Sequence, residues 1–190
     1  MKYFQKLVGE KVYLSPRSVD DAETYLKWMS DFQVTDYTGR TAQVLTIDGE
    51  IEYLKEKNLD TNEYHFGIVT LGNDKLIGSL SLERINHISR SAELGILIGD
   101  EEYRGSGYGA DAIKLVLDYA FNYLNMHSVW LHLIDCNDRA HACYTKCGFK
   151  DCGRRPEAIY LNGKYHDQLT MCILDREFNG EQYIKNRLIK

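Results

Sequence analysis

Three glycines at alternate positions separate an apolar segment from a strongly periodic one in the middle of this chain. Residues 93–98 have the composition of a strand, and apolar residues recur at helical spacing after the glycines. The connection reads Tyr103-Arg104-Gly105-Ser106-Gly107-Tyr108-Gly109-Ala110. Because glycine has no side chain, successive backbone N–H groups can converge on an anion at the helix start, and Arg104 adds a positive charge. The loop therefore predicts a pyrophosphate site between a strand and a helix.

Two other phosphate loops and a purely structural turn compete with this interpretation. A Walker loop ends in Gly-Lys-Ser or Gly-Lys-Thr, whereas this loop ends in Tyr108-Gly109-Ala110. A dinucleotide fingerprint fits better, with Asp135 after the next strand, but its third glycine comes one position later than here. That fold also starts with its glycine loop, while here several predicted strands come first. A tight turn without a ligand uses glycine for the same backbone freedom and stays open.

A second constellation, residues 137–149, follows the predicted strand at residues 128–134 directly. Asn137 suits the N-cap of a short helix, Asp138 suits its first turn, and Gly148 suits the left-handed position that ends it. Tyr144 lies seven residues after Asn137, so two helical turns bring both to the same side. If this strand and the preceding one separate, that side faces a bound cofactor.

Together, the glycine loop and the pattern Asn-x-Arg-Ala-x-x-x-Tyr-x-Lys-x-Gly-Phe resemble the GNAT superfamily of N-acetyltransferases. The resemblance is closest to the subgroup of ribosomal-protein N-terminal acetyltransferases and spermidine N-acetyltransferases, and covers about residues 12–178. It implies an α/β (α+β) fold with a mixed, mostly antiparallel central sheet, a splayed central strand pair and flanking helices. It also implies one acetyltransferase domain over residues 1–190, with a core of about 11–178. Acetyl-CoA is the expected co-substrate, and no metal is expected.

The resemblance implies two catalytic residues. Tyr144 would be the general acid beside the departing sulfur, and Glu93, on the strand leading into the loop, would be the general base. Glu93 could equally pair with a neighbouring charge such as Arg90. Three other residues stay open as substitute bases, although a structural role fits each of them better: Glu83, His87 and His132.

The cofactor contacts follow from the same resemblance. The backbone of one strand would bind pantetheine as if adding a strand, through Ile96, Leu97 and Ile98. The loop would hold the pyrophosphate, through Arg104, Gly105, Ser106, Gly107, Tyr108, Gly109 and Ala110. Asn137 and Tyr144 would face the cofactor from the second motif.

The expected reaction is direct attack of a neutral primary amine on the acetyl thioester in a ternary complex. An alkylammonium of pKa about 10.4 must first lose a proton at neutral pH, which requires a base or a water chain. A phenol of pKa about 10 protonates a thiolate of pKa about 8.5 uphill by about 2 kcal/mol. Hydrogen bonding from Tyr144 is therefore the expected first effect, ahead of complete proton transfer.

The acceptor is left open between a protein N-terminus, a polyamine and another small amine. Residues 85–93 and 162–165 resemble spermidine acetyltransferases, yet residues 31–43 lack the clustered glutamates that such enzymes use around the polyamine. The segment at residues 32–45 is expected to be irregular and to line the amine pocket. The alternative from another class is a chain that binds acetyl-CoA as a sensor or interaction module without transferring the acetyl group.

Composition limits the remaining possibilities. The chain has 190 residues, 44% of them hydrophobic, and a net charge of −5 with dispersed lysines and arginines, so nucleic acid is not an expected partner. No apolar run of membrane-spanning length occurs, and we expect a cytoplasmic protein. The five cysteines form no Cys-x-x-Cys and are expected to be reduced; a metal site at Cys143, Cys147 and His141 is a weaker alternative to buried thiols. A homodimer through exposed strand edges is conceivable.

Local patterns also predict the other elements. Residues 12–16 should form a strand, and Ser18 to Asp21 resembles a capping box before a helix whose apolar face is Ala22, Tyr25, Leu26 and Met29. A second helix is expected at about residues 48–57, and hairpins are expected around Gly72-Asn73-Asp74 and Asn162-Gly163. Their strands are predicted at residues 64–71, 75–82, 158–161 and 165–174. The polar tail, residues 179–190, is expected to fray.

Overall fold

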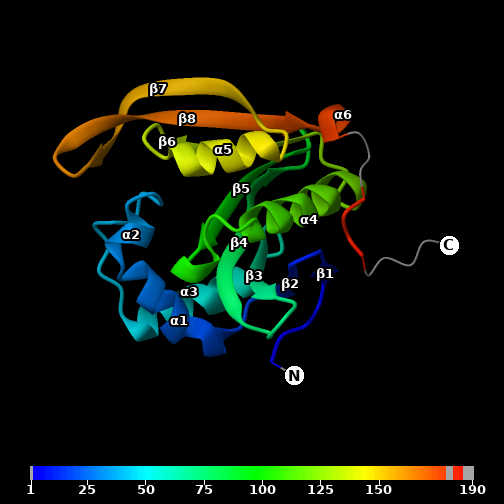
Figure 1. Ribbon diagram of the computed structural model, residues 1–190, viewed down its shortest axis with the longest axis horizontal. Helices are drawn as coiled ribbons and strands as arrows, with labels where there is room; N and C mark the ends of the chain where they lie inside the picture. Colours follow the sequence, from blue (N-terminus) through cyan, green and yellow to red (C-terminus); the bar gives the residue numbers. More distant parts are fainter. Residues whose placement is uncertain (1, 179–181, 186–190) are drawn as a thin grey trace.

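The computed structural model describes residues 2–178 and 182–185. In that part of the chain one sheet has the strand order β1-β2-β3-β4-β5-β6-β8-β7 (Figure 1). The strands are β1 Leu7–Val8, β2 Val12–Pro16, β3 Tyr64–Thr70, β4 Leu76–Asn86, β5 Ser91–Ile98, β6 Ser128–Ile134, β7 Lys150–Leu161 and β8 Lys164–Leu174. The helices are α1 Ala22–Met29, α2 Phe32–Thr35, α3 Ile47–Leu59, α4 Tyr108–Asn122, α5 Asp138–Lys146 and α6 Asp175–Phe178, with 3-10 turns η1 Val19–Asp21 and η2 Glu101–Tyr103.

The pairing of β5 with β6 is short and parallel, while the other pairings in the sheet are antiparallel. The two strands are in register only at Ser91↔Ser128, Ala92↔Val129 and Glu93↔Trp130. Beyond Glu93, β5 continues beside β4 alone as far as Ile98. The expected mixed, mostly antiparallel sheet with a splayed central pair is therefore confirmed.

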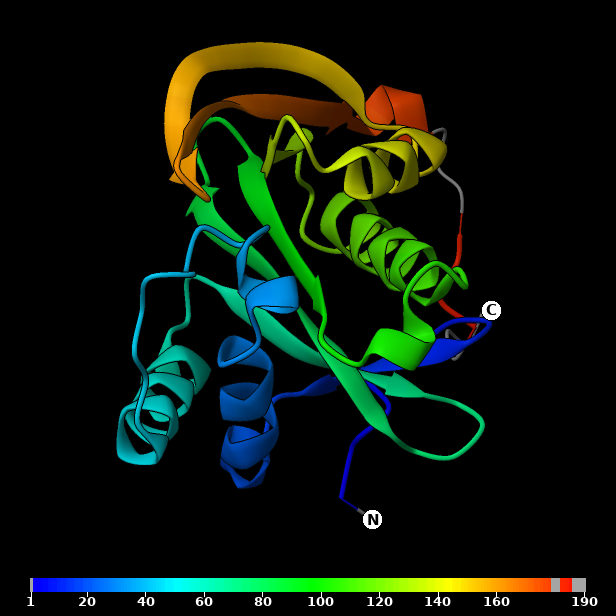
Figure 2. The same ribbon diagram turned by 60° about the vertical axis from the view of Figure 1, so that its left-hand side comes forward.

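Both faces of the sheet are covered. Val12, Leu14 and Ile68 belong to the larger apolar core, which contains the buried side of α4. Tyr13 and Val69 point the other way, into a smaller core shared with α1 and α3. Alternation along a strand sends neighbouring side chains to opposite faces, which explains this division. Figure 2 shows α1 and α3 on one side of the central strands and α4 on the other.

Two aspartates of α4 bind one segment from the first part of the chain and one from its last part. Asp111 Oδ2 accepts hydrogen bonds from the N–H groups of Lys11 (2.8 Å) and Val12 (3.0 Å). Asp118 is fully buried, and its Oδ2 accepts from the N–H groups of Tyr183 (2.6 Å) and Ile184 (3.0 Å). The expectation of a frayed tail is therefore wrong for residues 182–185. Residues 179–181 and 186–190 lie outside the described part of the chain.

The first helix departs from its expected pattern in two ways. Ser18 Oγ accepts from the N–H of Asp20, but Asp21 does not complete a capping box, because its Oδ1 accepts from the Tyr3 hydroxyl 2.9 Å away. The buried face of α1 also includes Trp28, which the sequence pattern missed. Its ring faces Gly99, where an added Cβ would lie only 2.0 Å from Trp28 Cδ2.

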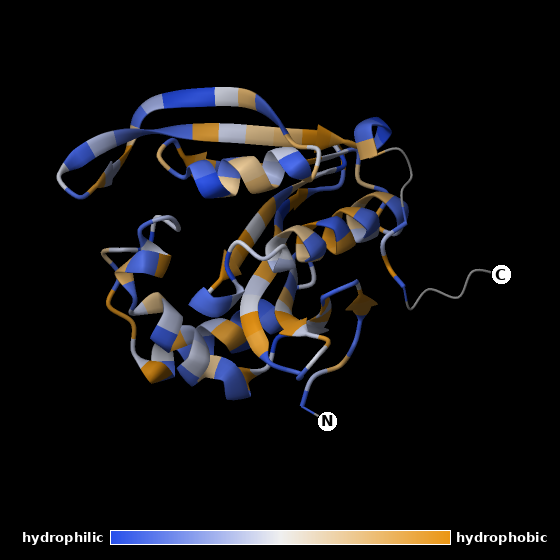
Figure 3. Ribbon diagram, viewed as in Figure 1, coloured by the Kyte–Doolittle hydropathy of each residue, from blue (hydrophilic) through white to orange (hydrophobic). Residues whose placement is uncertain are grey.

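Most other predicted elements are present with changed bounds. The helix at residues 48–57 is α3, and both hairpins form at their predicted turns, with Asn162 and Gly163 in the left-handed region. Residues 32–45 were expected to be irregular but begin with the short α2. The strand expected from residue 158 is in fact β7, which starts at Lys150 and is almost entirely exposed, consistent with its largely hydrophilic colouring in Figure 3.

Candidate active site

A cleft of about 870 Å³ follows the splay between β5 and β6. The start of α4 and one side of α5 line one end of it, and α1, α2, α3 and the loop after α2 line the other. Eleven residues predicted from the sequence contribute to its walls: Glu93, Ile96, Leu97, Ile98, Arg104, Gly105, Gly107, Gly109, Ala110, Asn137 and Tyr144. The fold therefore brings the two sequence motifs to one cavity.

The start of α4 offers backbone donors to this cleft. Gly107 is the N-cap in a left-handed conformation (φ 87°), and no side chain caps the helix. The first helical hydrogen bond runs from the N–H of Asp111 to the carbonyl of Gly107 (3.0 Å), which leaves the preceding N–H groups without helical partners. An uncapped helix start of this kind is an anion site, because the free N–H groups and the helix dipole both favour negative charge.

Space beside the loop fits a pyrophosphate. A Cβ added to Gly105 would meet nothing within 4 Å, so this backbone borders open space. A Cβ on Gly109 would lie 3.7 Å from Ile98 Cγ1 and 3.9 Å from Ile96 Cδ1, in the strip between the helix start and β5. Residues without side chains thus keep open the path from the loop to the strand edge.

The charged residues at the loop have structural contacts of their own. Arg104 donates from Nε to the Ile98 carbonyl (3.0 Å) and from Nη2 to the Gly99 carbonyl (2.8 Å), so its guanidinium fixes the loop to the end of β5. Lys11, which the sequence analysis missed, donates from Nζ to the Ser106 carbonyl (2.8 Å) and lies 5.3 Å from the Tyr108 ring centroid. Ser106 and Tyr108 are not among the residues lining the cleft.

The edge of β5 provides the next part of the wall. Leu94 to Ile98 pair with β4 but not with β6, so this edge presents backbone groups toward the splay. An extended amide chain can pair with such an edge as an added strand would. Ile96, Leu97 and Ile98 lie on this edge and line the cleft, and their contact with pantetheine stays a prediction.

The α5 motif folds as its sequence predicts. Asn137 caps the helix by accepting at Oδ1 from the N–H of Ala140 (3.2 Å), and Gly148 takes the left-handed conformation (φ 97°). Tyr144 lines the cleft, and within residues 2–178 and 182–185 its hydroxyl has no hydrogen-bond partner. Burial raises the pKa of Tyr144 above its usual value of 10, with a further contribution from Cys143. The hydroxyl is thus a strong candidate for a hydrogen-bond donor and a poor one for a full proton donor.

Glu93 lies at the point where β5 leaves β6. Its carboxylate pairs with Arg84 (Oε2 to Nη1, 3.1 Å), and its side chain keeps 19% of its exposure. Arg84 has a left-handed backbone (φ 48°) at an irregularity in the β4–β5 pairing, which carries its side chain to Glu93. Arg90 instead binds the Asn125 carbonyl and side chain, so Arg84 and not Arg90 is the partner of Glu93.

The electrostatic surroundings of Glu93 shift its pKa in both directions, with a net rise. Burial raises its pKa above 4.5, and Glu83, directly opposite on β4, adds to the rise. The positive charge of Arg84 opposes the rise, and so does His132. A raised carboxylate pKa brings a general base closer to neutral pH.

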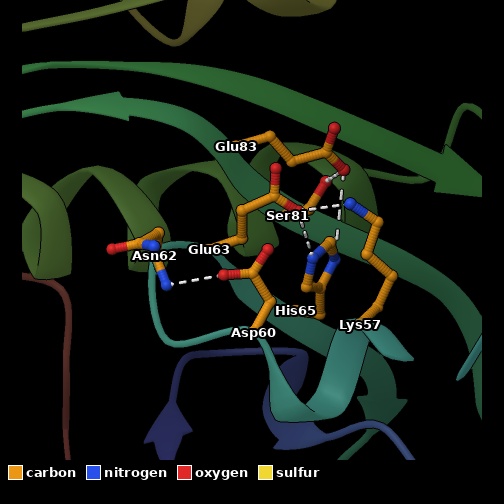
Figure 4. A network of polar contacts seen from close by, with 7 residues as sticks. All are labelled: Lys57, Asp60, Asn62, Glu63, His65, Ser81 and Glu83. Atoms are coloured by element: carbon orange, nitrogen blue, oxygen red, sulfur yellow. Dashed lines mark hydrogen bonds and ion pairs between the residues drawn. The ribbon is translucent and has the colours of Figure 1, made fainter. Parts of the chain in front are cut away.

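Glu83 lines the cleft and belongs to a network of polar contacts (Figure 4). Ser81 Oγ donates to Glu83 Oε1 at 2.8 Å, and His65 Nδ1 lies 3.9 Å from the same oxygen. On its other side, His65 Nε2 contacts Glu63 Oε2 (2.9 Å), which also pairs with Lys57 Nζ (2.7 Å). Burial lowers the pKa of His65, followed by the charge of Arg17, while Glu63 and Glu83 oppose the shift.

The other two substitute bases differ in position. His132 lines the cleft, with Nδ1 3.0 Å from the Thr170 hydroxyl oxygen. His87 lies in the exposed turn between β4 and β5 and is not among the cleft residues. Glu83 and His132 therefore stay candidates on geometry, whereas His87 does not belong to this site.

The far end of the cleft includes the segment at residues 32–45, which the sequence analysis expected to line the amine pocket, together with residues of other segments that it did not assign. Arg17 follows β2, Tyr25 is on α1, Arg40 is in the loop after α2, and Glu50 and Tyr53 are on α3. Both arginines lie near the Tyr53 ring, with guanidinium carbons 5.6 Å (Arg17) and 5.5 Å (Arg40) from its centroid. No local motif marks these positions, because they come from four separate segments.

Cys143 and Cys147 are in contact with each other, but among the described residues they and His141 do not form a group that could hold a metal ion. His141 Nε2 contacts Asp151 Oδ1 at 3.0 Å, and Cys147 is buried with Sγ 3.9 Å from the Ala110 carbonyl oxygen. All five cysteines are free thiols.

Comparison with known proteins identifies the class. The family model described as Acetyltransferase (GNAT) domain matches residues 11–150. The chain is 36% identical over 129 residues to spermidine N(1)-acetyltransferase of Vibrio cholerae, covering 68% of this chain and 74% of that protein. It is 30% identical over 123 residues to the putative ribosomal N-acetyltransferase YdaF of Bacillus subtilis, covering 65% and 66%.

Solved structures agree. The crystal structure of the Vibrio cholerae spermidine N-acetyltransferase in complex with CoA and spermine superposes with a TM-score of 0.81 at 29% identity, covering 88% of this chain and 98% of that one. The chain belongs to the GNAT family of acetyltransferases. The expected fold, the enzyme class and acetyl-CoA as co-substrate are thereby confirmed. None of the helices that the structure describes is long and apolar enough to cross a membrane.

Proposed function

We propose that this protein transfers the acetyl group of acetyl-CoA to a primary amine by direct attack in a ternary complex. One observation carries the proposal: the unpartnered Tyr144 hydroxyl, the uncapped start of α4 and the free edge of β5 line a single cleft. The relatives reported above are named for N-acetylation of spermidine and for ribosomal N-acetylation, and both kinds of acceptor can present a primary amine.

Each part of the cleft has a role in the proposal. The first-turn N–H groups of α4 bind the pyrophosphate, with Arg104 and Lys11 fixing the loop, and the backbone of Ile96 to Ile98 binds the pantetheine arm. When bound, acetyl-CoA supplies a thioester that a neutral amine can attack. Asn137 shapes the start of α5 through its cap. Ser106 and Tyr108 act in this scheme through backbone position alone.

Two side chains act on the proton of the amine and on the charge of the departing sulfur. Glu93 takes the proton that an alkylammonium must lose, and its raised pKa suits that task. Tyr144 donates a hydrogen bond to negative charge that develops on sulfur, a role that its raised pKa favours over full transfer. The two residues thus deal with opposite ends of the reaction.

Organisation and partners complete the proposal. We infer one acetyltransferase domain over residues 1–190 with a core of about 11–178, supported by the single sheet and by the family match to residues 11–150. A homodimer is compatible with the long exposed edge strand β7. A cytoplasmic location and the absence of a nucleic-acid partner stay predictions.

The direct test is release of free thiol from acetyl-CoA with a panel of primary amines, with acetyl-CoA binding followed by calorimetry. Release that depends on both an amine and the enzyme is the expected result. Binding of acetyl-CoA without release for any amine class would favour the sensor alternative, and absence of binding would contradict the cleft assignment.

A further inference from the structure

The two ends of the cleft differ in the way their charges are balanced. At the β5 end, Glu93 pairs with Arg84, while Glu83 accepts from Ser81 and lies near His65. These carboxylates can receive a cationic amine. At the α3 end the arginines outnumber the carboxylates, so this end can receive an anionic group.

Arg17 is the clearest case of an unbalanced charge. Its Nε and Nη2 atoms, which form one bidentate edge of the guanidinium, are shielded from solvent and have no hydrogen-bond partner. In the described ranges 2–178 and 182–185, neither Arg17 nor Arg40 forms an ion pair. A guanidinium held in this way is matched to the two oxygens of a carboxylate or to a phosphate.

The neighbouring groups do not remove the imbalance. Glu50 is 6% exposed and is the carboxylate of the α3 end on which both arginines act, while Glu83, at the β5 end, also acts on Arg40. Tyr25 is 4% exposed, and its hydroxyl, also unpartnered, adds a donor beside Arg17. The α3 end therefore presents an excess of positive charge and unfilled donors.

Two acidic residues of the adjoining segment each use one carboxylate oxygen in a hydrogen bond. Asp31 caps α2 by accepting from the N–H of Gln33 (2.9 Å), and Asp36 accepts from Asn162 Nδ2 (3.3 Å). Neither aspartate is among the cleft residues. The second ammonium group of a polyamine would thus meet Arg17 and Arg40 without a compensating carboxylate from this segment.

We propose that the acceptor is a primary amine carrying a carboxylate or another anionic group, which Arg17 and Arg40 bind at the α3 end while the amine lies at Glu93 and Glu83. The inference rests on the proposed transfer to amines and names the acceptor class. A free amino acid and a peptide with an acidic residue near its N-terminus share this chemistry.

The test uses acceptors of equal length that differ at one end: 5-aminopentanoate, 1-aminopentane and 1,5-diaminopentane, followed by ω-amino acids of other lengths. Thiol release should give a kcat/KM at least about tenfold higher for the carboxylate than for the uncharged amine, with the diamine lowest. The tripeptides Ala-Asp-Ala and Ala-Asn-Ala form the second arm of the test. A preference for Ala-Asp-Ala over Ala-Asn-Ala would indicate that the carboxylate is supplied by a peptide and not by a free amino acid.

Variants locate the effect. Arg40→Met and Arg17→Met should each reduce kcat/KM for the carboxylate acceptor by about 10- to 100-fold, mainly through KM, and leave 1-aminopentane and acetyl-CoA binding unchanged. Arg176→Met removes an exposed arginine of α6 that does not line the cleft and is the matched control for net charge. If Arg17→Met fails to fold, Arg40→Met and the wild-type acceptor series still decide the matter.

The outcomes separate the two proposals. Preference for the diamine over the carboxylate, or equal losses for all acceptors in the arginine variants, would overturn the inference and leave amine acetylation standing. If acetyl-CoA binds but none of the acceptors causes thiol release, both proposals are overturned.

Discussion

The two ends of the cleft offer different kinds of binding group. At the β5 and α4 end, the binding groups are backbone N–H and C=O groups whose positions follow from strand, loop and helix geometry. At the α3 end, they are side chains of Arg17, Tyr25, Arg40, Glu50 and Tyr53, contributed by separate segments. A backbone site tolerates many sequences and fits a ligand shared by a whole family, whereas a side-chain site can differ between relatives.

This difference predicts separable effects. Changes at the backbone end should alter acetyl-CoA binding or the chemical step for every acceptor. Changes at the side-chain end should alter the choice of acceptor and leave acetyl-CoA binding intact. The following variants test this division, from the largest expected effect to the smallest.

Tyr144→Phe should have the largest effect, because it removes the one hydroxyl assigned to the departing sulfur. We expect turnover to fall by roughly 10²- to 10⁴-fold for every acceptor, with acetyl-CoA affinity nearly unchanged by calorimetry. Tyr160→Phe removes a hydroxyl from the exposed face of β7 and is the control. Turnover that survives in Tyr144→Phe would remove this residue from the mechanism.

Glu93→Gln should come next, lowering kcat/KM by about 10²-fold. The carboxylate must be deprotonated to act, so kcat/KM should fall as the pH drops through the raised pKa of Glu93. The charge of Arg84 opposes that rise, so Arg84→Met should raise the pKa further and move the acidic limb of the profile to higher pH. Arg90→Met, whose guanidinium binds Asn125 instead, should leave the limb in place.

Comparing Glu93→Gln with Glu83→Gln distinguishes the two carboxylates, which face each other across β4 and β5. If Glu83→Gln causes the larger loss and abolishes the acidic limb, then the base is Glu83 and the assignment of Glu93 is wrong.

The same division explains what could be predicted from the sequence. The strand, glycine loop and α4 are contiguous, and the cap residues of α5 lie within twelve positions, so local rules were enough for the fold around them. The splay of β5 from β6 was predicted from the family resemblance. The structure shows it as a β5–β6 pairing that ends after Glu93.

The remainder depended on contacts between distant segments. Arg104 was expected to add a positive charge beside the pyrophosphate, but the contacts of its donors with the carbonyls of Ile98 and Gly99 are not encoded in the local sequence. Lys11 reaches the loop only because Asp111 holds the β1–β2 turn against α4. Arg17 and Arg40 meet at Tyr53 only after α1 and α3 have packed on the sheet.

Gly107→Ala tests the backbone end with a smaller effect. An alanine in the left-handed conformation costs about 1–2 kcal/mol, and relief of that strain would shift the first-turn N–H groups of α4. We expect acetyl-CoA affinity to fall by about tenfold, measured by calorimetry. Gly163→Ala creates comparable strain at the β7–β8 turn (φ 79°) and should destabilise the protein similarly without weakening acetyl-CoA binding. Equal affinity in the two variants would contradict the anion site.

His65 gives the smallest and most indirect test, because it is not among the residues that line the cleft and meets it only through Glu83. Its folded-state pKa is lowered by burial and by Arg17, so the unfolded chain binds the proton more readily. The free energy of unfolding should therefore decrease as the pH falls below about 6.5, and His65→Gln should flatten that decrease in denaturant titrations at several pH values. The residues that face the ring, Glu63 with Lys57 and Glu83 with Ser81, are unchanged in the variant. If the free energy of unfolding falls as steeply with pH in His65→Gln as in the wild type, another group causes the acid sensitivity. If the fall is flattened and the acidic limb of the kcat/KM profile also changes, the contacts of His65 with Glu83 also act on the amine end of the cleft.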